Sequence, residues 1–69
     1  MTVEDLLKQL EHERKLEYVS YFRYGSEAQE AMLHNDKDDY AFYKRLSTES
    51  DKKIERLGIV IDEIKKRVS

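Results

Sequence analysis

The stretch His34-Asn35-Asp36-Lys37-Asp38-Asp39 divides the sequence into two halves of similar length. Asn35 readily adopts the left-handed backbone conformation with which many helices end. Asp36 is a preferred helix N-cap, and Asp39 follows three residues later, where an acidic side chain supports the cap. The stretch therefore predicts that one helix ends and another begins across a turn at about residues 35–36.

Before this turn, apolar side chains recur every three or four residues, as in an amphipathic helix. Thr2 is a suitable N-cap with Asp5 in the capping-box position, so the helix is expected over about residues 3–34. Gly25 could bend or end this helix, but the spacing continues in phase through it, which favours one continuous helix. The apolar stripe consists of Val3, Leu6, Leu7, Leu10, Tyr21, Tyr24, Ala28, Ala31 and Met32.

After the turn, a second stripe predicts a helix over about residues 37–68. Three cations, Lys65, Lys66 and Arg67, suit the C-terminal end of its dipole. The stripe consists of Phe42, Tyr43, Leu46, Ser50, Ile54, Leu57, Ile61, Ile64 and Val68.

Two long helices joined by a short turn predict an antiparallel hairpin, in which facing residues have numbers that add up to about 71. In this register, small residues of each helix face tyrosines of the other, as close packing requires. The facing sets are Ala28 and Ala31 with Tyr40 and Tyr43, and Ser47 and Ser50 with Tyr21 and Tyr24. The sequence therefore predicts an all-α fold, a single helical-hairpin domain over residues 1–69.

The composition predicts that this hairpin associates with a second copy. The chain has 69 residues, of which 39% are apolar and 41% charged, with no proline and no cysteine. So short a chain buries a small core and has no disulfide to support it. Leu16, Val19, Phe22 and Ile59 lie off the main seam and are expected to form a second apolar patch at mid-height. We therefore expect a homodimer that closes into a four-helix bundle.

Four charged residues near the middle of the seam are expected to form a polar core. Glu13, Arg14 and Glu17 interrupt the first stripe, and Lys53 faces them in the hairpin register. We expect Arg14 to pair with Glu17 or with a carboxylate of a second copy, and Lys53 to balance the remaining acid. Such polar positions can fix the register of helices or the choice of partner.

Catalytic and metal sites find little support in the sequence. No serine has a histidine in matching register, and no glycine-rich phosphate loop is present, so we expect neither an enzyme nor a cofactor. Glu30 and His34 lie one helical turn apart near Glu27 and Asp38, a spacing that can hold a divalent ion. A histidine near a helix C-terminus among acids is more typically solvated, and the prediction is no metal site.

Charge and hydropathy narrow the partner classes. The net charge of −2 argues against a nucleic-acid clamp, and no apolar run is long enough to span a membrane, so a cytoplasmic location is expected. Basic residues interleaved with tyrosines still leave a dimeric RNA- or DNA-binding regulator as an alternative. The basic residues concerned are Arg14, Lys15, Arg23, Arg45, Lys52, Arg56 and Lys65, with Glu49 and Glu63 interrupting the row on the second helix.

These observations favour a small non-enzymatic interaction or regulatory module that recognises a protein partner through an apolar helix face. The expected contact consists of Tyr18, Val19, Phe22 and Ile59, with Tyr40 and Phe42 as a second cluster near the turn. Burial of the same residues inside the homodimer is an open alternative. A purely structural assembly protein is the second alternative function.

Overall fold

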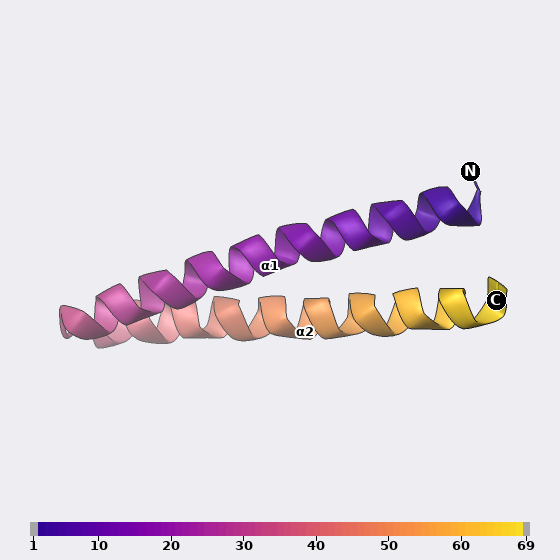
Figure 1. Ribbon diagram of the computed structural model, residues 1–69. Coiled ribbons are helices and arrows are strands. Elements are labelled where there is room, and N and C mark those ends of the chain that lie inside the picture. The colour runs from indigo at the N-terminus through magenta and orange to yellow at the C-terminus, as the bar shows by residue number, and fades with distance from the viewer. Residues whose placement is uncertain (1, 69) are drawn as a thin grey trace.

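The computed structural model describes residues 2–68, which form two long helices packed as an antiparallel hairpin (Figure 1). Helix α1 spans Val3–Leu33 and helix α2 spans Lys37–Val68. The hairpin measures 50 × 15 × 14 Å, and α1 begins at the same end of the molecule at which α2 ends. The predicted all-α hairpin is confirmed. Met1 and Ser69, which the predicted domain includes, lie outside the described residues.

Helix α1 begins with the predicted capping box and runs unbroken through Gly25. The Asp5 backbone N–H donates to Thr2 Oγ1 at 3.1 Å, and the Thr2 N–H donates to Asp5 Oδ2 at 3.4 Å. These two bonds satisfy backbone donors that the first turn of a helix leaves unpaired. Continuity through Gly25, favoured by the phase of the apolar stripe, is confirmed.

The turn between the helices has the geometry that its sequence predicts. Asn35 has a φ of 56°, in the left-handed region, and the Asp36 N–H donates to the Ala31 carbonyl at 2.8 Å. Together with the bond from the Asn35 N–H to the Met32 carbonyl, this is a Schellman motif. Asp36 then caps α2, because its Oδ1 accepts from the Asp39 N–H at 3.0 Å.

The seam between the helices is built differently in its two halves. Near the turn the buried side chains are small, and half-buried tyrosines flank them. Toward the termini the seam contains isoleucines and leucines, and Ile61 is only 1% exposed. In the view of Figure 1 the two ribbons overlap near the turn and are seen apart toward the termini. The buried residues are Ala28, Ala31, Ser47, Ser50, Ile54 and Ile61.

The predicted register is confirmed by residues of opposite helices that border the same hollows. Gly25 and Ser47 line one hollow, and Glu17 and Lys53 line another. Each pair falls within one position of the register predicted from the turn. This register places the aromatic residues near the turn and the charged residues at mid-height, on the two flanks of the seam.

Candidate functional site

Two of the hollows along residues 2–68 border the seam on opposite flanks of the hairpin. The aromatic hollow, of about 480 Å³, lies near the turn. The charged hollow, of about 380 Å³, lies at mid-height. Within α2, Tyr40 and Lys44 lie on one side of the buried row and Lys53 and Leu57 on the other, which places the hollows on different flanks. The aromatic hollow is lined by Tyr21, Phe22, Gly25, Ser26, Ala28, Gln29, Met32, Tyr40, Lys44 and Ser47.

Small residues form the floor of the aromatic hollow and large side chains form its walls. Gly25, Ala28 and Ser47 lie where the helices come together, and a Cβ added at Gly25 would meet nothing within 4 Å. Tyr21 and Phe22 supply one wall, with their rings in edge contact at 5.5 Å and 73°. Because the packing of the helices uses side chains this small, space is left between the flanking rings.

Phe22 is held in place but little covered. Its ring packs against Tyr21, yet the residue remains 65% exposed. Tyr40 completes the hollow from α2, and together with Met32 it also lines a smaller hollow of about 190 Å³ that reaches the turn. The aromatic surface therefore continues along this flank to the end of the hairpin.

The six predicted contact residues, expected as one contact and a second cluster near the turn, lie on several parts of the surface. Phe22 and Tyr40 line the same hollow, and Tyr18 lies one turn before Phe22 on the same flank. Val19 is exposed on the outer side of α1, at the edge of this region. Phe42 lies elsewhere, with its ring against Tyr43 at 5.2 Å.

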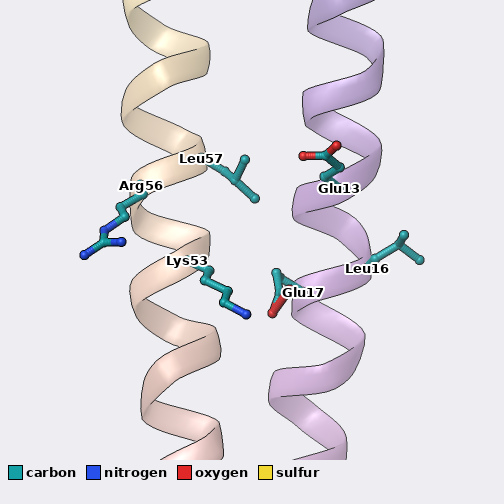
Figure 2. Close-up of a pocket in the computed structure, with 6 residues that line it drawn as sticks. All are labelled: Glu13, Leu16, Glu17, Lys53, Arg56 and Leu57. Carbon is teal, nitrogen blue, oxygen red and sulfur yellow. The ribbon is translucent and has the colours of Figure 1, made fainter.

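Ile59 is separated from the other contact residues. It stands two positions before the buried Ile61, which places it on the opposite, outward face of α2, where it is 57% exposed. Figure 2 shows Leu16 pointing away from α2. The expected mid-height patch of Leu16 with Ile59 is therefore wrong, because equal height along the hairpin does not put two side chains on the same side.

The sequence did not single out Gly25, Met32 and Lys44 as site residues. Gly25 carries a signal, since a glycine inside a helical pattern needs a reason, but its sequence position indicates only that the helix could bend or end there. The helical spacing places Met32 in the seam, whereas in the structure it is exposed and lines both hollows near the turn. Gly25, Met32 and Lys44 are seen to line one hollow only when the structure places Tyr40 and Ser47 of α2 opposite α1.

The charged hollow brings together two acids from α1 and two bases from α2. Figure 2 shows Glu13, Glu17, Lys53 and Leu57 pointing into the space between the helices. Arg56 lines the same hollow but points away from α1. Within residues 2–68, none of these charged groups forms an ion pair with another.

Arg14 does not join the charged hollow. Its Nη1 lies 3.7 Å from the position that a Cβ at Gly58 would occupy, so the guanidinium lies along the other helix at that glycine. In the described part of the chain it makes no ion pair with Glu17. The predicted role of Glu13, Arg14, Glu17 and Lys53 in setting register or partner choice stays a prediction.

Two further electrostatic interactions lie near the two ends of the hairpin. Near the termini, Lys65 Nζ and Glu11 Oε1 form an ion pair at 3.3 Å. At the turn, the nearby Asp36 carboxylate raises the pKa of Asp39 above 3.8. Over residues 2–68, no three acidic or histidine side chains are grouped so that they could hold a metal ion. Neither α1 nor α2 is apolar over a length that could cross a membrane.

Comparison of the chain with protein families, with curated proteins and with solved structures found no match. Function is therefore inferred from the surfaces of the molecule. These are an aromatic hollow near the turn and, on the opposite flank, a charged hollow with acids on one helix and bases on the other.

Proposed function

We propose that this protein is a small non-enzymatic interaction module, which works as a homodimer of hairpins and binds a helix of a protein partner in the aromatic hollow. The observation that carries this proposal is the apolar surface that a single hairpin leaves uncovered. Large apolar side chains are exposed on both helices and on both flanks. Where such side chains gather, as around the aromatic hollow, the surface is typical of protein–protein contacts.

The total surface supports the need for a partner. The hairpin exposes 5758 Å². A compact monomer of 8.3 kDa is expected to expose roughly 4,600 Å². The excess of about 1,200 Å² is larger than the roughly 800 Å² that each partner contributes to an interface of standard size. Each hairpin therefore exposes enough additional surface to form one protein–protein interface of standard size.

The shape of the aromatic hollow suits an apolar side chain presented by a helix. Rings on its walls and small residues on its floor form a pocket of the kind that accepts a leucine or phenylalanine anchor. Gly25 supports this assignment. Glycine inside a helix costs about 1 kcal/mol relative to alanine, and the hairpin's own packing leaves the space above Gly25 empty. An incoming side chain would use that space.

The rim of the hollow adds a charge preference. Lys44 is exposed at its edge, and the neighbouring polar rim residues Gln29 and Ser26 carry no charge. An ammonium group in this position favours a partner with an acidic residue beside its apolar anchor. The partner class is therefore an amphipathic helix with an apolar anchor and an acid on the adjoining turn.

The proposal is tested with a displayed library of helical peptides that vary at anchor and flanking positions. We expect the selected peptides to have a large apolar anchor and a nearby acid, and to shift the backbone amide NMR signals of Tyr21, Gly25 and Tyr40. Phe22→Glu should weaken binding at least tenfold, because it places a charge on the wall of the hollow. Ile59→Glu is the matched control and should bind normally, since Ile59 is similarly exposed but lies on the outward face of α2.

Two results would overturn the proposal. Selected peptides that bind Phe22→Glu and the unmodified protein equally would show that the hollow is not the site. RNA or DNA binding that is stronger than peptide binding and falls steeply with added salt would favour the nucleic-acid regulator instead.

A further inference from the structure

We propose that the flank bearing the charged hollow is the self-docking face, on which a second copy of this chain packs with its turn at the same end. This inference rests on the proposed function and specifies how the dimer forms. Each α1 would then lie against α2 of the second copy. Glu13 and Glu17 of each hairpin would face Lys53 and Arg56 of the other.

The first observation is a second stripe of large side chains on α2, next to the seam. Phe42, Leu46, Leu57, Val60 and Ile64 recur at helical spacing and are exposed or half-buried. A helix whose apolar stripe is this wide needs neighbours on two sides. Helix α1 covers one side, and the other is open on the flank of the charged hollow.

The second observation is the distribution of charge on this flank. The acids Glu13 and Glu17 come from α1, whereas Lys53 and Arg56 come from α2 at the same height. Because no ion pair joins them across the hollow within the described residues, their charges are available to a facing surface. On this flank, Phe42 and Leu46 lie toward the turn, and Val60 and Ile64 lie toward the termini. The four charged residues of the hollow therefore lie near the centre of the flank.

Charge complementarity selects one of two symmetric arrangements. A two-fold dimer that packs this flank on itself has the two turns either at the same end or at opposite ends. With the turns at opposite ends, α1 faces α1 and α2 faces α2, so acids meet acids and bases meet bases. With the turns at the same end, α1 faces α2 and every acid meets a base. Since like charges facing one another are unfavourable, we choose the second arrangement.

The same arrangement gives Leu16 a partner. This side chain lines the charged hollow, points away from its own α2 and remains 54% exposed, so the hairpin alone covers only part of it. With a second copy on this flank, Leu16 would contact the stems of the facing Lys53 and Arg56 side chains. Long basic side chains commonly cover apolar surface in this way.

This dimer has a consequence for binding. The aromatic hollow lies on the opposite flank and stays open in each copy. Because the turns lie at the same end, both aromatic hollows would lie at that end of the bundle, on its outer sides. The dimer would therefore hold two partner helices at one end, on opposite sides of the bundle, which increases the avidity for a partner that presents two such helices far enough apart to reach both sides.

The test uses charge reversal in complementary pairs. The double variant Glu13→Lys with Glu17→Lys makes all four charged residues of the hollow basic. The double variant Lys53→Glu with Arg56→Glu makes all four acidic. We expect each double variant alone to dimerise at least tenfold more weakly than the unmodified chain in sedimentation equilibrium. An equimolar mixture should recover dimers of near-normal affinity. Repulsion inside each chain is unchanged by mixing, so recovery reports the contact between copies and not an effect on folding.

Orientation is measured separately by spin labels on Lys37→Cys, since the chain has no other cysteine. With the turns at the same end, the distance between labels should be well below the 50 Å length of the hairpin. A distance close to that length would overturn the proposed orientation.

Three other outcomes would overturn this inference. They are a chain that stays monomeric up to millimolar concentration, double variants that dimerise as well as the unmodified chain, and a mixture that recovers nothing. These failures are distinguishable from failure of the proposed function. Peptide binding in the aromatic hollow is measured on a different flank and can persist in a monomer or in another dimer.

Discussion

The half of the hairpin near the turn and the half near the termini follow the same helical spacing but pack in different ways. Near the turn, the buried residues are Ala28, Ala31, Ser47 and Ser50, and tyrosines stand at the sides. Near the termini, Ile54 and Ile61 are buried and leucines fill the seam around them. The change occurs without any break in either helix.

This difference explains why the aromatic hollow lies near the turn. Small side chains allow close contact between helices, and large rings are then placed beside the seam and not inside it. The rings border open space with a floor of small residues. In the other half, aliphatic side chains fill the seam themselves. A seam of small residues therefore leaves open space bordered by aromatic side chains beside it.

The largest expected effect is in the terminal half, where one side chain is completely covered. Ile61→Ala should lower the free energy of unfolding by about 3 kcal/mol, because it removes buried methyl groups and leaves a cavity. Ile59→Ala is the matched control and should change it by less than about 0.5 kcal/mol, since Ile59 is mostly exposed. Urea denaturation followed by circular dichroism at a fixed protein concentration measures both.

Equal losses from the two variants would contradict the assignment of the inward and outward faces of α2. They would also remove the contrast between the two halves, because that contrast depends on Ile61 filling the terminal seam.

Near the turn, the expected damage comes from adding volume. Ala28→Leu should destabilise the hairpin by about 2 kcal/mol, since the close contact between helices has no room for a larger side chain. Ala41→Leu makes the same change at an exposed position of α2 and should be nearly neutral. Thermal unfolding of both variants measures the two changes in stability. If Ala28→Leu were neutral or stabilising, the small residues would not be what brings the helices together.

The fold was predictable because local signals and long-range pattern agreed. Thr2 with Asp5, and Asn35 with Asp36, mark helix ends by hydrogen bonds between near neighbours, which depend little on the rest of the chain. The register then followed from a short turn. A hairpin can be predicted from one sequence when the signals for its helix ends agree with the spacing of apolar residues along both helices.

The candidate site was less predictable, since it depends on which flank each side chain occupies. Periodicity places Phe22 and Tyr40 off the seam on their own helices, but their meeting in one hollow requires both helices to be placed. Equal height along the hairpin groups Leu16 with Ile59, but Leu16 points away from α2 and Ile59 lies on the outward face of α2. Arg14 has a long side chain that can reach several partners, and sequence spacing does not reveal that it lies at Gly58.

The two glycines, one in each half of the hairpin, are expected to respond differently to replacement by alanine, with a smaller effect on stability than the core substitutions. Gly25→Ala should raise the free energy of unfolding by about 0.5–1 kcal/mol, because alanine is the better helix former and its Cβ would meet open space. Gly58→Ala should gain no more than this, since its Cβ would contact Arg14 Nη1 at 3.7 Å. Thermal denaturation compares the two. Gly25→Ala should also weaken peptide binding, which separates a functional reason for glycine from a structural one.

A loss of stability from Gly25→Ala would contradict the open floor of the aromatic hollow. Equal peptide affinity before and after the substitution would show that the ligand does not reach Gly25, even where the stability gain is as expected.

The smallest expected effect concerns charge, which also differs between the two ends. The terminal half has the Glu11–Lys65 ion pair, whereas the turn places Asp36 and Asp38 near Asp39 and raises the pKa of Asp39 above 3.8, chiefly through the Asp36 carboxylate. A carboxyl whose pKa is raised by folding contributes stability that is present below pH 3.8 and is lost as the pH rises through the raised value. Asp39 should therefore oppose folding slightly at neutral pH.

Asp36→Asn isolates this effect, because asparagine still caps α2 but has no charge. The pKa of Asp39 should fall toward 3.8 in the variant, as followed by the ¹³C chemical shift of its carboxyl carbon during an acid titration. Glu11→Gln, at the other end of the hairpin, is the control and should leave the Asp39 titration unchanged. If the Asp39 pKa were the same in Asp36→Asn, the two carboxyl groups would be too far apart in solution to interact. The turn would then lack the electrostatic character that distinguishes it from the terminal end.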